Sequence, residues 1–112
     1  MKKVNFKIRD RYNGDEILQE VLAEEYDENV YYVSPRINIH CIYPYSFYDK
    51  KTGLIVCYGK NKQELINKYN EVKERYTQVR ESVHYKKYIE KYEQLKKEER
   101  KNGIRSSSYK LN

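Results

Sequence analysis

Hydrophobic residues alternate with polar ones from the start of the chain. In VNFKIRDRY, residues 4–12, apolar side chains occupy every second position up to Ile8, and basic residues occupy most positions between them. Successive side chains of a β-strand point to opposite faces of its sheet. The pattern therefore predicts a half-buried strand with a basic outer face.

Two interpretations compete for the next segment, residues 13–28. Asn13-Gly14 is a strong signal for a two-residue hairpin turn, whereas Asn13 followed by Glu16 also fits the capping box of a helix. Apolar residues at helical spacing follow, and acidic residues suit a helix N-terminus because of the helix dipole. We favour a short acidic helix. A hairpin would instead add a strand and line an edge with the acidic groups.

After Asn29 the hydrophobic period returns to two. NVYYV, residues 29–33, and INIHCIYPY, residues 37–45, predict two strands with a break at Pro35. Pro44 cannot donate a hydrogen bond to a neighbouring strand, so we expect a bulge or a sheet edge near it.

A hairpin is predicted for residues 48–58. YDKKTG, residues 48–53, is typical of a turn, because Asp can open the turn and Gly53 can adopt a positive φ at its close. The apolar run LIVCY that follows is typical of a buried strand.

Helical spacing governs residues 61–101. Asn61 with Glu64 predicts the N-terminal cap. The apolar stripe then changes phase near Ser82, so we expect a break or bend there. Ser-rich residues 102–112 are predicted to form a flexible tail.

These elements together predict one α+β domain over residues 1–101. Residues 1–60 would form a small antiparallel sheet of three or four strands with the short acidic helix, and residues 61–101 the long C-terminal helix. A length of 112 residues fits one domain. With 38% hydrophobic residues and 14 tyrosines, the core is expected to be small and rich in tyrosine rings.

The composition also bears on cellular location. No apolar run approaches the ~18 residues needed to cross a bilayer, and the N-terminus lacks the apolar stretch of a secretory signal. We expect a cytoplasmic protein of a bacterial host, with its two cysteines reduced. Abundant Lys, Asn, Ile and Tyr indicate the AT-rich codons of a low-GC bacterium or its phage.

Charge is unevenly distributed along the chain. The formal net charge is +6, yet no Lys or Arg and seven acidic residues lie between Arg11 and Arg36, which leaves about +13 on the rest. Such separation favours charged partners. The candidate residues for binding a protein partner through an acidic face are Glu20, Glu24, Glu25, Asp27 and Glu28.

Candidate catalytic groups are sparse. His40 and His84 are the only histidines, and neither has a Ser, Cys or carboxylate in a recognised catalytic spacing. On a strand, His40 and Cys41 would point to opposite faces, and the chain has no C-x-x-C motif. YGKNK, residues 58–62, has one glycine where a phosphate-binding loop needs two. We predict a non-enzymatic protein without catalytic residues, metal site or cofactor.

Lysines interleaved with tyrosines provide the clearest signal for nucleic-acid binding, because lysine neutralises phosphates and aromatic rings stack on unpaired bases. HYKKYIEKYEQLKKEERK, residues 84–101, places Lys87 and Lys91 near one flank of a helix. Its first three tyrosines share the apolar stripe, so those rings would lie in the core or in the seam of a homodimer.

Residues 48–72 resemble the arm-type DNA-binding domain of phage and transposon integrases: a hairpin, the strand LIVCYG and a helix opened by KNKQELINKYNEV. In that family a three-stranded sheet lies in the major groove of DNA and a helix packs behind it. The resemblance implies four DNA-facing residues: Lys50, Lys51, Tyr58 and Lys60. The helix, three strands and helix expected from Asp15 onward also resemble a double-stranded-RNA-binding domain.

The chain as a whole is short, lacks catalytic motifs and separates its charges. In these respects it resembles phage-encoded inhibitors of host defence, notably anti-CRISPR proteins. This resemblance implies that the acidic segment covers a nucleic-acid channel of a Cas effector or a similar host ribonucleoprotein, while the basic helix contacts guide RNA or DNA. We expect such an inhibitor. The alternatives are a DNA-binding accessory protein that uses residues 48–58 and a homodimer built on the C-terminal helix.

Overall fold

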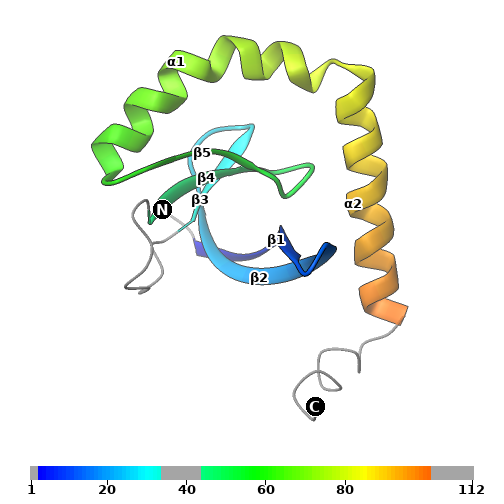
Figure 1. Cartoon of the computed structure of the whole chain (residues 1–112). Helices are drawn as coiled ribbons and strands as arrows, with labels where there is room; N and C mark the ends of the chain where they lie inside the picture. The colour runs from blue at the N-terminus through cyan, green and yellow to red at the C-terminus, as the bar shows by residue number, and fades with distance from the viewer. Residues whose placement is uncertain (1–2, 34–43, 102–112) are drawn as a thin grey trace.

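The computed structural model describes residues 3–33 and 44–101. It is an α+β fold in which a five-stranded antiparallel sheet, ordered β1-β2-β3-β4-β5, is followed by two helices (Figure 1). The strands are β1 (Lys3–Tyr12), β2 (Asp15–Glu25), β3 (Val30–Val33), β4 (Tyr45–Asp49) and β5 (Ile55–Gly59), and the helices are α1 (Lys62–Arg80) and α2 (Val83–Lys101). The α+β class is therefore as predicted, with five strands in place of three or four.

The prediction of a short acidic helix after Asn13 is wrong, because residues 15–25 form strand β2. Asn13 and Gly14 have φ of 50° and 86°, which is what a type I′ hairpin turn requires. Opposite charges then face each other across the hairpin, which favours strand pairing. The directly opposed pairs are Lys3 with Glu24, Lys7 with Glu20 and Arg11 with Glu16.

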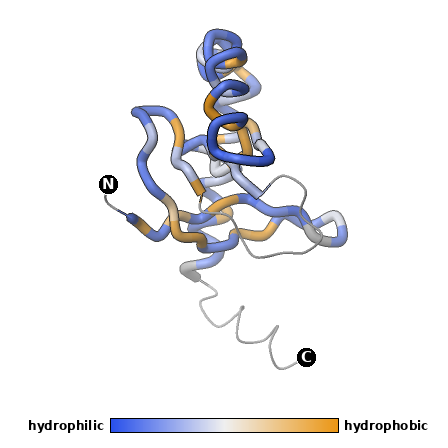
Figure 2. The backbone as a smooth tube through the Cα atoms, turned by 90° about the vertical axis from the view of Figure 1, so that its left-hand side faces the viewer, coloured by the Kyte–Doolittle hydropathy of each residue, from blue (hydrophilic) through white to orange (hydrophobic). Residues whose placement is uncertain are grey.

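Two hydrophobic clusters lie on opposite faces of the sheet, because strand β3 contributes alternate residues to each. The cluster beneath α1 consists of Val30, Tyr32, Phe47, Leu65 and Tyr69, and the other of Phe6, Ile8, Ala23 and Val33. Figure 2 shows hydrophobic positions recurring along the strands between hydrophilic ones. Both faces of the sheet are therefore used for packing, which explains how a polar chain builds a core.

Helix α2 covers a seam where β1 meets the turn between β4 and β5. The Arg9 amide donates to the Gly53 carbonyl at 2.9 Å, and the Tyr92 hydroxyl donates to the Lys7 carbonyl. Gly53 has φ of +69°, and a Cβ placed there would lie 2.5 Å from Cε1 of Tyr92. The curled sheet in Figure 1 thus requires glycine at the point where its last turn meets its first strand.

The basic outer face predicted for β1 is only partly solvent-exposed. Phe6 and Ile8 are buried as predicted. On the other face, Lys7 pairs with Glu99 of α2 at 2.6 Å. The side chain of Arg9 is 2% exposed, pairs with Glu16 of β2 and donates a hydrogen bond to the Tyr88 carbonyl of α2 at 3.5 Å. Half of the predicted basic face therefore fastens α2 to the sheet.

The helix boundaries follow the predicted capping signals. The Asn61 side chain accepts a hydrogen bond from the Glu64 amide at 2.8 Å, which confirms the N-terminal cap. Ser82 lies between α1 and α2, confirming the predicted break. Its hydroxyl donates to the Val79 carbonyl at 2.6 Å and accepts from the Tyr85 amide at 3.2 Å, so one side chain ends one helix and starts the next.

Two further predictions concern strands. The hairpin over residues 48–58 is confirmed by the antiparallel pairing of β4 with β5, and residues 29–33 are confirmed as a strand by β3. Pro44 lies directly before β4. Residues 37–43 of the strand predicted over residues 37–45 lie outside the described residues, as does the tail at residues 102–112.

Candidate functional site: an apolar groove at the helix elbow

An apolar groove of about 420 Å³ lies where α1 turns into α2 beside β5. We call it the elbow groove. Cavities of this size lie within the range that holds drug-sized ligands or the anchor side chains of a partner. The apolar side chains that define it come from three elements: Ile55 and Val56 of β5, Val72 and Val79 of α1, and Tyr85 and Tyr88 of α2.

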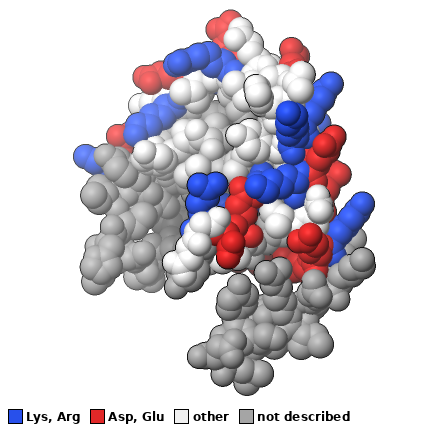
Figure 3. All heavy atoms as spheres, turned by 45° about the vertical axis from the view of Figure 1, so that its right-hand side comes forward, with Lys and Arg blue, Asp and Glu red and all other residues white. Residues whose placement is uncertain are grey.

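Much of this apolar lining is open to solvent. Ile55 is 48% exposed, Val79 is 54% exposed and Tyr88 is 47% exposed. Apolar side chains that are exposed singly are ordinary, whereas exposed apolar side chains gathered around one depression mark binding surfaces. Figure 3 shows uncharged surface between the charged side chains on this side of the molecule.

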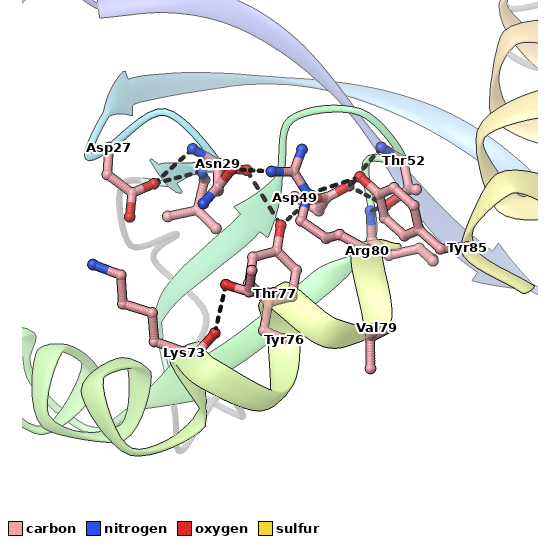
Figure 4. Close-up of polar contacts among 12 residues, drawn as sticks. Asp27, Asn29, Asp49, Thr52, Lys73, Tyr76, Thr77, Val79, Arg80 and Tyr85 are labelled. Atoms are coloured by element: carbon pink, nitrogen blue, oxygen red, sulfur yellow. Dashed lines mark hydrogen bonds and ion pairs between the residues drawn. The ribbon is translucent and has the colours of Figure 1, made fainter. Parts of the chain in front are cut away.

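A buried carboxylate lies beneath the groove and fixes the elbow. The Asp49 side chain is 3% exposed and forms an ion pair with Arg80 at 3.3 Å. It accepts hydrogen bonds from the Thr52 amide and hydroxyl and from the Tyr85 hydroxyl, each at 2.8 Å, and from the Tyr76 hydroxyl. Because these donors come from the hairpin turn and from both helices, Asp49 joins three elements at one point (Figure 4).

Val79 lies on the other side of the helix backbone from this network. In Figure 4 its side chain points away from the Asp49 carboxylate. Arg80, the next residue, points into the network and also donates to the Asn29 side chain. The polar network therefore fixes the orientation of α1 about its own axis, and this orientation leaves Val79 at the groove surface.

The reactive side chains near the groove are held in their protonated forms. Burial raises the pKa of the Cys57 thiol to about 11 and that of the Tyr85 hydroxyl to about 12. The pKa of Tyr76 is also raised, by burial and by its hydrogen bond to Asp49. A thiol that remains protonated at neutral pH is a poor nucleophile.

Arg75 is the charged side chain at the groove mouth. It lines the groove and is exposed. Within residues 3–33 and 44–101, no hydrogen bond or ion pair engages its guanidinium. The other charged residue of the lining, Asp49, is compensated by Arg80. The groove therefore combines an apolar wall with one available cation.

The predicted acidic face is divided between several contacts. Glu25 pairs with Lys50, which was itself predicted to bind nucleic acid. Asp27 accepts hydrogen bonds from the Asn29 and Val30 amides and from the Tyr69 hydroxyl. Burial raises the pKa of Asp27, but these hydrogen bonds outweigh burial and lower it. Asp27 thus stabilises the turn before β3.

The remaining acidic candidates face the basic strand or solvent. Glu20 and Glu24 lie on β2 opposite basic residues of β1, and Glu28 is exposed in the turn. Figure 3 shows Lys and Arg side chains interspersed with Asp and Glu on the face that includes α2. Charges that are separated along the sequence are thus mixed in space.

The predicted nucleic-acid-binding residues do not converge. Lys51 is exposed in the turn between β4 and β5, whereas Tyr58 and Lys60 lie at the other end of that hairpin. Lys91 pairs with Glu16 at 3.2 Å, and Lys87 is exposed on α2. The predicted residues therefore lie in three regions of the fold: the turn between β4 and β5, the other end of that hairpin, and α2.

Sequence reasoning missed the elbow groove. Val72, Val79 and Val83 belong to the apolar stripe that predicted a helix from residue 61 onward. The available signal was the phase change near Ser82, because a stripe that turns at a bend cannot remain over one sheet along its whole length.

No family model matches the chain, and neither a curated protein nor a solved structure resembles it detectably. Neither α1 nor the described part of α2 is long and apolar enough to span a membrane. In the described part of the chain, no three His, Cys, Asp or Glu side chains gather as metal ligands would.

Proposed function

We propose that this chain is a non-enzymatic binding protein that holds a protein partner in the elbow groove. The observation that carries the proposal is the half-exposed apolar lining formed by Ile55, Val79 and Tyr88. Burying such side chains against a partner is favourable by roughly 25 cal/mol per Å² of apolar area removed from water. The Asp49 network supports the proposal, because it orders the elbow before any partner arrives.

An extended macromolecular partner fits this surface better than a small molecule does. Small-molecule pockets commonly bury 70–90% of their ligand, whereas three lining residues here are about half exposed. Open apolar grooves between helices are the surfaces on which amphipathic segments dock.

The role we propose is inhibition of a host nucleic-acid-handling complex, such as a CRISPR-Cas nuclease. This role is supported by a resemblance in kind to anti-CRISPR proteins, since the chain is short, lacks catalytic motifs and separates its charges along the sequence, and the elbow groove supplies the protein contact. The acidic segment is a weaker candidate contact, since Glu25 is paired and Asp27 is engaged in a turn. Direct DNA binding through residues 48–58 is less favoured, because Lys50 is paired and Tyr58 lies at the far end of the hairpin.

A matched pair of variants tests the groove. Val79→Glu places a charge in the groove, and Leu22→Glu makes the same chemical change at a similarly exposed residue of β2. Each protein is immobilised, a host lysate is passed over it, and the affinity of the main captured protein is then measured with purified components. Loss of one hot-spot contact weakens binding by about tenfold or more, so we expect that loss for Val79→Glu alone. Equal affinity of the two variants would refute the groove as the contact.

Inhibition is measured on the same proteins. The wild type and Leu22→Glu are expected to suppress target cleavage by a susceptible purified Cas complex, and Val79→Glu is expected to require about tenfold more protein. A panel of such complexes that all cleave normally would contradict the inhibitor role while leaving the binding function open to the capture experiment.

A further inference from the structure

The chemistry of the groove mouth indicates what kind of segment binds there. Arg75 lies three residues after Val72 and four before Val79, so the three side chains share one face of α1. All three line the groove. A guanidinium beside an apolar wall is suited to a ligand that offers both a carboxylate and an apolar side chain.

Arg75 differs from the other arginines whose side chains are described. Arg9 and Arg11 pair with Glu16, and Arg80 pairs with Asp49. Glu71 stands four residues before Arg75, a spacing that allows an ion pair on a helix, yet no ion pair forms between them in the described structure. The guanidinium of Arg75 is thus the one described arginine group left for a partner.

The lining of the groove leaves no negative charge unpaired. The first turn of α2 contains no acidic residue and carries Lys86. Asp49, the carboxylate that lines the groove, is compensated by Arg80 and by hydrogen bonds from hydroxyl groups. An anionic segment therefore meets no unpaired carboxylate in the lining itself.

We infer that the partner contributes an acidic amphipathic segment, whose apolar side chains fill the elbow groove while an Asp or Glu carboxylate pairs with Arg75. This inference rests on the proposed function and adds the chemistry of the partner. The open lining suits a helical segment that presents two apolar residues one turn apart. The carboxylate fixes the position of the segment in the groove, because Arg75 offers a single point of ionic attachment among the lining residues.

Selection from a library of displayed random peptides tests this inference with the full chain immobilised. Wild-type protein is expected to enrich peptides with two apolar residues three or four positions apart and a nearby Asp or Glu. Arg75→Glu is expected to shift enrichment toward peptides with Lys or Arg. Arg11→Glu, which reverses a charge on a side chain that is 75% exposed elsewhere, serves as the matched control and should select the same peptides as wild type.

An enriched peptide is then synthesised and its affinity measured by fluorescence anisotropy. We expect about tenfold weaker binding to Arg75→Glu, and no more than about twofold weaker binding to Arg11→Glu. Circular dichroism establishes that each variant is folded.

The outcomes separate the two proposals. Peptides that require Val79 but carry no acidic preference, or that bind Arg75→Glu as tightly as wild type, would overturn the acidic segment and leave the groove as a binding site. Failure to enrich any peptide, or self-association that Val79→Glu abolishes in sedimentation, would overturn the inference. In the latter case a second copy of this chain occupies the groove.

Discussion

Replacing Asp49 with Asn tests whether one buried carboxylate holds the elbow together. The substitution keeps the shape of the side chain and removes its charge. An amide nitrogen would then face donors that now point at a carboxylate oxygen, among them Arg80 and the Tyr85 hydroxyl. At least one buried donor would lose its acceptor.

The expected cost follows from the contacts. Breaking a buried ion pair by removing one partner costs about 3–5 kcal/mol, and hydrogen bonds to charged groups contribute about 1.5–3 kcal/mol each. With the carboxylate 3% exposed, we expect Asp49→Asn to lower the free energy of unfolding by about 3–5 kcal/mol. That is a large share of the ~5–15 kcal/mol typical of a domain.

Urea denaturation followed by circular dichroism measures this change. Tyr85→Phe removes one donor and should cost about 1–2 kcal/mol. The double variant should cost less than the sum of the two, because both substitutions disrupt the same network. A loss below about 1 kcal/mol for Asp49→Asn, with an unchanged m value, would refute the assignment of the elbow to this carboxylate.

Three further predictions concern the seam and the titrating groups. Gly53→Ala should lower the free energy of unfolding by about 2–4 kcal/mol in urea denaturation, because the added Cβ would lie 2.5 Å from the Tyr92 ring at a residue with positive φ. Gly14→Ala is the control, because a Cβ there would meet nothing within 4 Å, and it should cost about 1–2 kcal/mol. Equal costs would contradict the close packing of the seam. Although burial raises the pKa of Glu16, hydrogen bonds and charges from its basic neighbours outweigh burial and lower it. Its contribution to stability is therefore present above the unfolded pKa and lost as pH falls through the lowered folded-state pKa, and a Glu16→Gln variant with the same acid dependence as wild type would disprove this. Five tyrosines have a raised pKa, chiefly through burial: Tyr32, Tyr69, Tyr76, Tyr85 and Tyr92. Their contribution to stability is full below the unfolded pKa of 10 and is lost as pH rises above it. Tyrosinate absorbance should therefore appear together with unfolding, and titration of the whole set before unfolding would contradict their burial.

The parts of the fold that the sequence predicted are those fixed by local chemistry. The cap at Asn61, the break at Ser82 and the hairpin turn before Gly53 each depend on residues within a few positions of one another. β2 was mistaken for a helix because Asn13 starts two competing local signals. The charge pairs that favour the hairpin, such as Lys7 opposite Glu20, join distant residues and become visible only once the strands are aligned.

The candidate site could not be predicted from the sequence, because it is formed by tertiary structure. A stripe of apolar residues on a helix indicates burial, and Leu65 and Tyr69 are buried accordingly. Val79 continues the same stripe but lies where α1 extends to the elbow, so it remains 54% exposed. The acidic and basic segments are separate in the sequence, whereas Glu25 and Lys50 pair with each other in the fold.

The most direct test of the groove is an NMR titration of the isotope-labelled chain with a peptide selected on it. Backbone amide shifts at Ile55, Val79 and Tyr88, with Leu22 unchanged, are the result that we predict. Shifts centred on the β1–β2 hairpin or on Tyr58, with the groove residues unmoved, would contradict the proposal that this protein binds its partner at the helix elbow.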